Sequence, residues 1–177
     1  MVCASALLTV AGSDLPAQTA RASEYRLKAV FLFNFAQFVD WPPEAFPDSQ
    51  APLVIGVLGD DPFGGFLDET VRGEHLGGRP FEIRRSQSVD EIKPCLLLFI
   101  SQSEGNRVEE ILASLKHRPI LTVSDGDGFA GRGGMIQFVT DRNRIRLKIN
   151  LRAAQGANLT ISSKLLRVAE VVQPTGR

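Results

Sequence analysis

The chain has 177 residues, of which 44% are hydrophobic and 23% are charged, and its formal net charge at pH 7 is zero. This length and composition are typical of one soluble globular domain with a sizeable core. The balanced charge argues against a nucleic-acid-binding protein, because such proteins usually carry a basic excess.

The first 22 residues differ in character from the rest of the chain. A short apolar run at residues 6–12 is followed by a polar stretch ending in Ala20-Arg21-Ala22, which is typical of a signal-peptidase site. No basic residue precedes the apolar run, although a secretory signal normally begins with one. We therefore predict a truncated export signal over residues 1–22 and a single mature domain over residues 23–177. A disordered N-terminal extension is the alternative.

Residues 25–43 predict a helix that is apolar on almost every side and ends at a Trp-Pro-Pro sequence. Such a helix is buried, spans a membrane or docks on a partner. Its apolar run is too short to cross a bilayer, which takes about 20 apolar residues. The helix is therefore expected to be a core helix or a docking helix.

The two sides of this helix have different expected roles. We expect one stripe to pack on a sheet, namely Leu27, Phe31, Phe35 and Phe38. The opposite side of the helix also carries Lys28. If a partner binds this segment, we expect it to contact that side and the Trp-Pro-Pro stop. The partner-contact candidates in this region are Leu32, Val39 and Trp41.

Strands and helices alternate after this helix, which predicts parallel βαβ units. Two continuous apolar runs, residues 53–58 and 95–100, are typical of strands buried on both faces. The remaining predicted elements are a helix from Asp60 or Asp61 to Val71, a strand at 79–85, a helix at 103–115 and a strand at 119–123. The predicted fold is an α/β sandwich with a central, mostly parallel sheet flanked by helices.

The last third of the chain has a different pattern from the βαβ units before it. Residues 134–141 and 143–151 predict an antiparallel hairpin at an edge of the sheet, and a final helix is expected from Ser162 or Ser163 to about residue 172. The second strand of the hairpin alternates apolar and basic residues. Arg144 and Arg146 on its basic face are further partner-contact candidates, although a solvated strand face is the simpler explanation.

The sequence gives little support for catalysis or for a bound cofactor or metal. A G-x-G-x-x-G string at residues 126–131 runs into a strand rather than a helix, which does not suit a dinucleotide site. Polar residues that follow strands leave room for a small-ligand site near Asp60, Ser101 and Asp125, or for a phosphoacceptor site. Cys95 is the one cysteine of the predicted mature chain and is expected to be a buried apolar residue.

Several segments together identify the chain as similar to the YfiR-like family of exported bacterial proteins. They occur in this order: LKAVFLFNFAQFVDWP, VIGVLGDDPFG, GRPFEIRR, LLFISQSE, LTVSDGDGFAGRGGMIQFV, NRIRLKINL and ISSKLLRVAE. The resemblance covers nearly all of residues 25–172.

The resemblance implies a periplasmic, non-enzymatic regulator that binds the periplasmic domain of an inner-membrane diguanylate cyclase and holds it inactive. It also implies control of cyclic-di-GMP and biofilm, a homodimer, and an outer-membrane lipoprotein antagonist. The family's namesake has two disulfides, whereas Cys95 has no partner in the predicted mature chain, so an internal redox bridge is not expected here. A periplasmic small-ligand sensor acting with a membrane histidine kinase or receptor is the alternative function.

Overall fold

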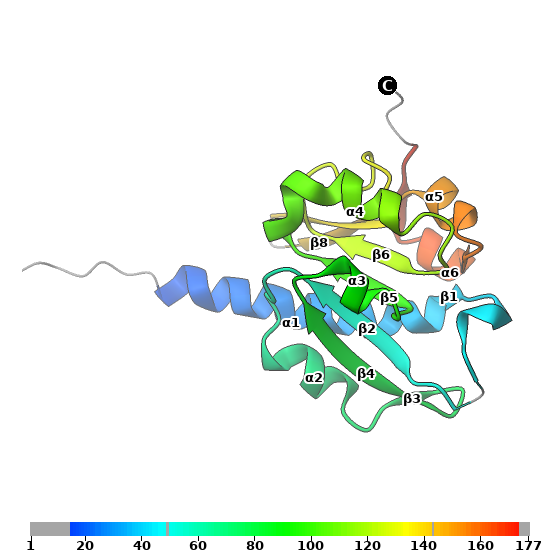
Figure 1. The fold of residues 1–177 in the computed structure, drawn as a ribbon. Coiled ribbons are helices and arrows are strands. Elements are labelled where there is room, and N and C mark those ends of the chain that lie inside the picture. The colour runs from blue at the N-terminus through cyan, green and yellow to red at the C-terminus, as the bar shows by residue number, and fades with distance from the viewer. Residues whose placement is uncertain (1–14, 49, 143, 174–177) are drawn as a thin grey trace, which may run out of the picture.

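A computed structural model describes residues 15–48, 50–142 and 144–173 of the chain (Figure 1). Its helices are α1 Leu15–Phe38, η1 Pro43–Ala45, α2 Gly65–Val71, α3 Val89–Ile92, η2 Gln102–Arg107, α4 Val108–Ser114, α5 Leu151–Gly156 and α6 Ser163–Leu166. Its strands are β1 Val39–Asp40, β2 Leu53–Leu58, β3 His75–Leu76, β4 Arg79–Ser86, β5 Leu97–Ile100, β6 Leu121–Ser124, β7 Ile136–Asp141, β8 Arg144–Ile149, β9 Thr160–Ile161 and β10 Ala169–Val171.

The centre of the fold is an eight-stranded sheet in the order β10-β8-β7-β6-β5-β2-β4-β3. All its pairs are parallel except β7–β8 and the short β3–β4 pair at one edge. The inner run β4-β2-β5-β6-β7 has the order of a doubly wound fold, with a topological switch point between β2 and β5. A separate antiparallel pair, β1–β9, joins the end of α1 to the C-terminal region. The predicted fold class is confirmed.

Helices cover both faces of the sheet, and the two faces have separate cores. On one face, α1 and α2 bury side chains such as Leu32, Phe35 and Leu67 against the odd-numbered residues of β2. On the other face, α3 and α4 pack Ile92 and Ile111 against the even-numbered ones. This alternation explains why residues 53–58 are apolar throughout, since each strand residue faces one core or the other.

Helix α1 differs from its prediction in both extent and orientation. It begins at Leu15, upstream of the predicted start at residue 25, and ends at Phe38 rather than at the Trp-Pro-Pro stop. Residues 15–22 of the predicted export signal belong to this helix, and residues 1–14 of that signal lie outside the described residues. None of the helices in the described ranges has the length and apolarity required to span a membrane.

Helix α1 is rotated from the expected orientation, so that only part of the expected stripe faces the core. Leu27 is 48% exposed and Val30 is 39% exposed, whereas Leu32 is fully buried and Val39 is 4% exposed. Phe35 is fully buried, as expected, and Phe31 and Phe38 are half-buried. The side of the helix that was expected to stay open therefore contributes much of the core.

The C-terminal third contains elements that were not predicted. The helix expected from residue 162 to about 172 is the short α6, followed by strand β10, which pairs parallel to β8. The β7–β8 hairpin is confirmed, but β10 is the outermost strand on that side of the sheet. Helix α2 also begins later than predicted, at Gly65, because Asp61 caps a turn at Phe63 rather than the helix itself.

The glycine-rich loop before β7 contains a position with no space for a side chain. A Cβ atom added at Gly134 would lie 2.1 Å from the buried ring of Phe129. We expect Gly134→Ala to lower the free energy of unfolding by about 1–3 kcal/mol through overpacking. Gly156→Ala is the matched control, because nothing lies within 4 Å of that position. Equal unfolding midpoints for the two variants in urea would contradict this close contact.

Candidate functional site

A group of ionisable side chains lies where the middle of α1 meets the carboxyl end of β6. Lys28 is 2% exposed, and its Nζ lies 2.6 Å from Asp125 Oδ2 and 2.5 Å from Glu24 Oε1. The Tyr25 hydroxyl donates a hydrogen bond of 2.8 Å to the same Asp125 oxygen. We call these four residues the Lys28 cluster. Because a lysine is almost never fully buried unless it is paired, Asp125 and Glu24 explain how α1 accepts one on its inner side.

The surroundings of the Lys28 cluster shift the pKa values of two of its members. Burial and the hydrogen bond to Asp125 raise the pKa of the Tyr25 hydroxyl, so it stays protonated at neutral pH. Burial acts to raise the pKa of Glu24, but its hydrogen bonds to Lys28 and Thr140 outweigh this and lower it. Asp125 Oδ1 is buried without a hydrogen-bond partner among the described residues. The contacts of Lys28 and Tyr25 with Asp125 hold α1 against the carboxyl end of β6.

The carboxyl ends of the strands do not assemble the small-ligand or phosphoacceptor site considered from the sequence. Asp61 accepts hydrogen bonds from Phe63 N and Arg85 Nε, and Asp125 is held by Tyr25 and Lys28. A hollow of about 310 Å³ at this edge is lined by Ser101, but by neither Asp60 nor Asp125. No group of three or more potential metal-binding side chains occurs within the described ranges.

The partner-contact candidates on α1 and β1 require a correction. Leu32 and Val39 belong to the core under the sheet and are not available to a partner. Trp41 is half-buried, and its Nε1 donates a hydrogen bond of 3.1 Å to the carbonyl of Leu96. This contact ties the segment after β1 to the start of β5.

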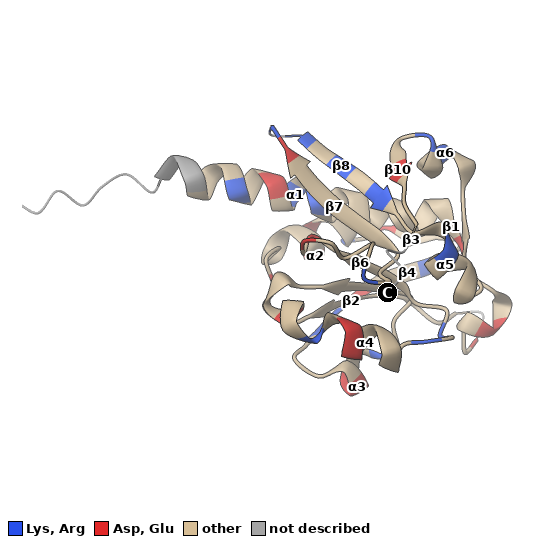
Figure 2. Ribbon diagram, turned by 90° about the horizontal axis from the view of Figure 1, so that it is seen from above, with Lys and Arg blue, Asp and Glu red and all other residues tan. Residues whose placement is uncertain are grey.

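Arg144 and Arg146 lie on the exposed face of β8, where Figure 2 shows a row of basic residues along the strand. Arg146 Nη2 lies 3.3 Å from Asp141 Oδ2. A hollow of about 570 Å³ between β8 and β10 is lined by Arg146, Arg167 and the 71% exposed Val168. Strands β7 and β6 separate β8 from β5, so the structure does not bring these arginines next to Trp41.

Cys95 is a buried thiol, as the sequence predicts, and it is the free cysteine of the described residues. Burial raises the pKa of this thiol to about 12. Because the thiolate is the reactive form, we expect negligible reaction of the folded protein with Ellman's reagent at pH 8. A Cys3→Ser variant allows Cys95 alone to be measured, and urea unfolding is expected to make it react rapidly. Rapid reaction of the folded variant would contradict the burial.

The raised thiol pKa also has a consequence for stability. The folded state holds the Cys95 proton more tightly than the unfolded chain does. The contribution of this group is therefore fully present below pH 9 and is lost as the pH rises toward 12. A Cys95→Ala variant is expected to lose less stability over this alkaline range, as measured by urea unfolding at stepwise higher pH.

A comparison with protein families decides which family the chain belongs to. The family described as YfiR/HmsC-like matches residues 25–170, which include every strand of the main sheet except the last residue of β10. The chain belongs to the YfiR/HmsC-like family. A comparison with curated proteins gave no match. Membership in the YfiR/HmsC-like family is consistent with a periplasmic regulator.

A comparison with solved structures adds support for the fold. The structure described as the ABC domain in complex with L-Trp, from Streptococcus pneumoniae, matches with a TM-score of 0.54 and 12% sequence identity. The match covers 83% of this YfiR/HmsC-like chain and 60% of that chain. The chain therefore spans less than two thirds of that protein, and at this identity the likeness concerns the fold alone.

Sequence reasoning identified Asp125 but missed its partner. The pairing of Lys28 with Asp125 joins residues that are 97 positions apart. A signal for it was present, because a lysine within an apolar helix needs a counter-charge wherever that side is buried. The sequence could not show which acidic residue supplies that charge.

Proposed function

We propose that this chain is a periplasmic, non-enzymatic regulator that binds and represses the periplasmic sensor domain of an inner-membrane signalling enzyme, most readily a diguanylate cyclase. The observation that carries the proposal is the YfiR/HmsC-like match over residues 25–170. Repression of such a cyclase keeps cyclic-di-GMP low and disfavours biofilm formation. Homodimer formation and release by an outer-membrane lipoprotein belong to the same proposal.

The surface around β8 and β10 is the part of the molecule that we propose for the partner. Arg146 lies beside the exposed apolar side chain of Val168, and Arg144 lies further along the same exposed face of β8. Protein interfaces are enriched in arginine, and their strongest contacts combine such side chains with desolvated apolar anchors. An acidic face on the sensor domain would complement this surface. Trp41 is retained as a separate contact candidate.

A pull-down of the exported protein from solubilised membranes tests the proposal. The wild-type chain is expected to recover an inner-membrane protein with a periplasmic sensor domain. The double variant Arg144→Glu/Arg146→Glu should lower that recovery at least about tenfold, since opposed like charges at an interface cost several kcal/mol. Arg72→Glu is the matched control, because Arg72 is exposed at the end of α2, outside the proposed surface.

Two outcomes of this experiment would count against the proposal in different ways. Failure of the wild-type chain to recover any inner-membrane signalling protein would contradict the function. Equal recovery with the wild type, the double variant and the Arg72→Glu control would support binding to a membrane signalling protein. It would contradict the proposal that the β8–β10 surface makes the contact.

A further inference from the structure

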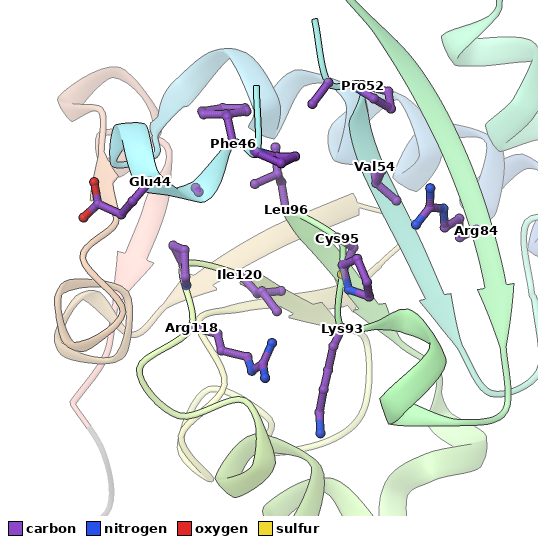
Figure 3. A pocket seen from close by; sticks show the side chains of 15 residues that line it. Glu44, Phe46, Pro52, Val54, Arg84, Lys93, Cys95, Leu96, Arg118 and Ile120 are labelled. Atoms are coloured by element: carbon purple, nitrogen blue, oxygen red, sulfur yellow. The ribbon is translucent and has the colours of Figure 1, made fainter. Parts of the chain in front are cut away.

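A cavity of about 450 Å³ lies at the amino ends of β2, β5 and β6, opposite the sheet edge at which ligands were expected (Figure 3). One wall comes from the connector, by which we mean the described residues 41–48 and 50–52, and includes Phe46 and Pro52. The starts of the strands supply Val54, Leu96 and Ile120. This volume lies within the usual range for small-molecule sites.

The connector is held in place at both ends, so this cavity is formed without a ligand. At one end, the Trp41 indole nitrogen donates to the Leu96 carbonyl at 3.1 Å. At the other end, Arg79 Nη1 donates to the carbonyls of Asp48 and Ala51, each at 2.8 Å. The Arg79 guanidinium also lies 4.3 Å from the centroid of the Phe46 ring. A preformed wall lowers the entropic cost of binding.

The charged side chains that line the cavity are mostly basic. The lining includes three basic residues, Arg84, Lys93 and Arg118, and one acidic residue, Glu44. Arg84 is paired with Glu82, and Lys93 with Asp90, whereas Arg118 is in no ion pair within the described ranges and has only a longer-range charge interaction with Asp90. Figure 3 shows Arg118 and Lys93 on the same side of the cavity, across from Phe46 and Pro52.

We propose that this cavity binds a small organic anion with an apolar body. The apolar body lies against Phe46, Val54 and Ile120, and the carboxylate or sulfonate group meets Arg118 at the opening. A bare inorganic anion would leave the apolar walls uncovered, and a cation would face the basic side chains. The inference does not depend on the proposed membrane partner, because the isolated protein contains the whole cavity.

Fluorescence titration with 8-anilino-1-naphthalenesulfonate tests this inference directly. The folded protein is expected to bind the dye, and decanoate should displace it at a lower concentration than the neutral decanamide does. Arg118→Gln should weaken binding of the dye and of decanoate about three- to tenfold, as expected for loss of a partly exposed charge-assisted hydrogen bond. Arg152→Gln, on the exposed side of α5, should leave both affinities unchanged.

Two further variants test the apolar walls. Ile120→Trp should fill the cavity and abolish binding of the dye and of decanoate, with folding checked by circular dichroism. Phe46→Ala changes a half-buried residue of the connector, so the protein should still fold. This variant should lower the affinity for the dye and for decanoate. Absence of dye binding to the wild type, or an affinity that is unchanged in Arg118→Gln and Phe46→Ala, would overturn the inference.

Discussion

Asp125→Ala is expected to lower the free energy of unfolding by about 3–5 kcal/mol, which is the usual effect of removing one partner of a buried ion pair. The variant leaves the ammonium of Lys28, which is 2% exposed, with Glu24 as its remaining carboxylate partner among the described residues. It also removes the acceptor of the Tyr25 hydroxyl. Urea unfolding followed by circular dichroism measures the change.

Two further variants separate the ion pair from other effects of the substitution. Asp127→Ala changes an exposed aspartate two residues away and should alter stability by less than about 0.5 kcal/mol. The double variant Lys28→Met/Asp125→Ala removes both charges of this pair and should be more stable than Asp125→Ala alone, because no buried ammonium is left with the more exposed Glu24 as its one carboxylate partner. A double variant that is less stable than Asp125→Ala would refute this account of the Lys28 cluster.

The second large effect is expected at Leu32. This side chain is fully buried between α1 and the sheet, so Leu32→Ala should cost about 2–5 kcal/mol through lost burial and a residual cavity. Leu27 is the matched control, since it is the same residue type on the same helix but is 48% exposed. Leu27→Ala should cost less than about 1 kcal/mol.

The comparison of the two leucines tests the orientation of α1. The same urea unfolding measurement applies to both variants and requires no knowledge of the partner. A larger loss of stability for Leu27→Ala than for Leu32→Ala would mean that the stripe expected from the sequence, with Leu27 inward, is the correct one.

The central strands could be predicted from the sequence because the length and flanking residues of their apolar runs favour strands. Strand β2 has the predicted bounds, since a six-residue apolar run between Pro52 and Gly59 is too short for a typical helix and suits a strand buried on both faces. The β7–β8 hairpin was likewise predictable from the alternation of apolar and basic residues in β8. The parallel pairing of the inner strands follows from the βαβ pattern, whereas their order in the sheet was not predicted.

The orientation of α1 could not be predicted because its pattern is ambiguous. Apolar residues occur on every side of the helix, so its sequence contains no strong preference for one buried stripe. The decisive contact is the pairing of Lys28 with Asp125, which depends on the position of β6 in the finished sheet. The rotation of α1 from its expected orientation also removed Leu32 and Val39 from the candidate surface.

The C-terminal elements were missed for a different reason. Residues 162–172 have the spacing of a short helix, and Ser162 caps α6 as expected. The chain then pairs Ala169–Val171 with β8, a tertiary interaction that local periodicity does not report. The cavity under the connector was missed too, because its walls come from segments that are far apart in the sequence.

Cellular cyclic-di-GMP is the measurement that tests the central claim most directly. Deletion of the gene in its host is expected to raise the cyclic-di-GMP level, and expression of the wild-type chain fused to a complete secretory signal should restore the lower level. The Arg144→Glu/Arg146→Glu variant should restore it poorly, whereas the Arg72→Glu control should act like the wild type. A cyclic-di-GMP level that is unchanged by both deletion and expression would contradict the proposal that this chain represses a membrane diguanylate cyclase.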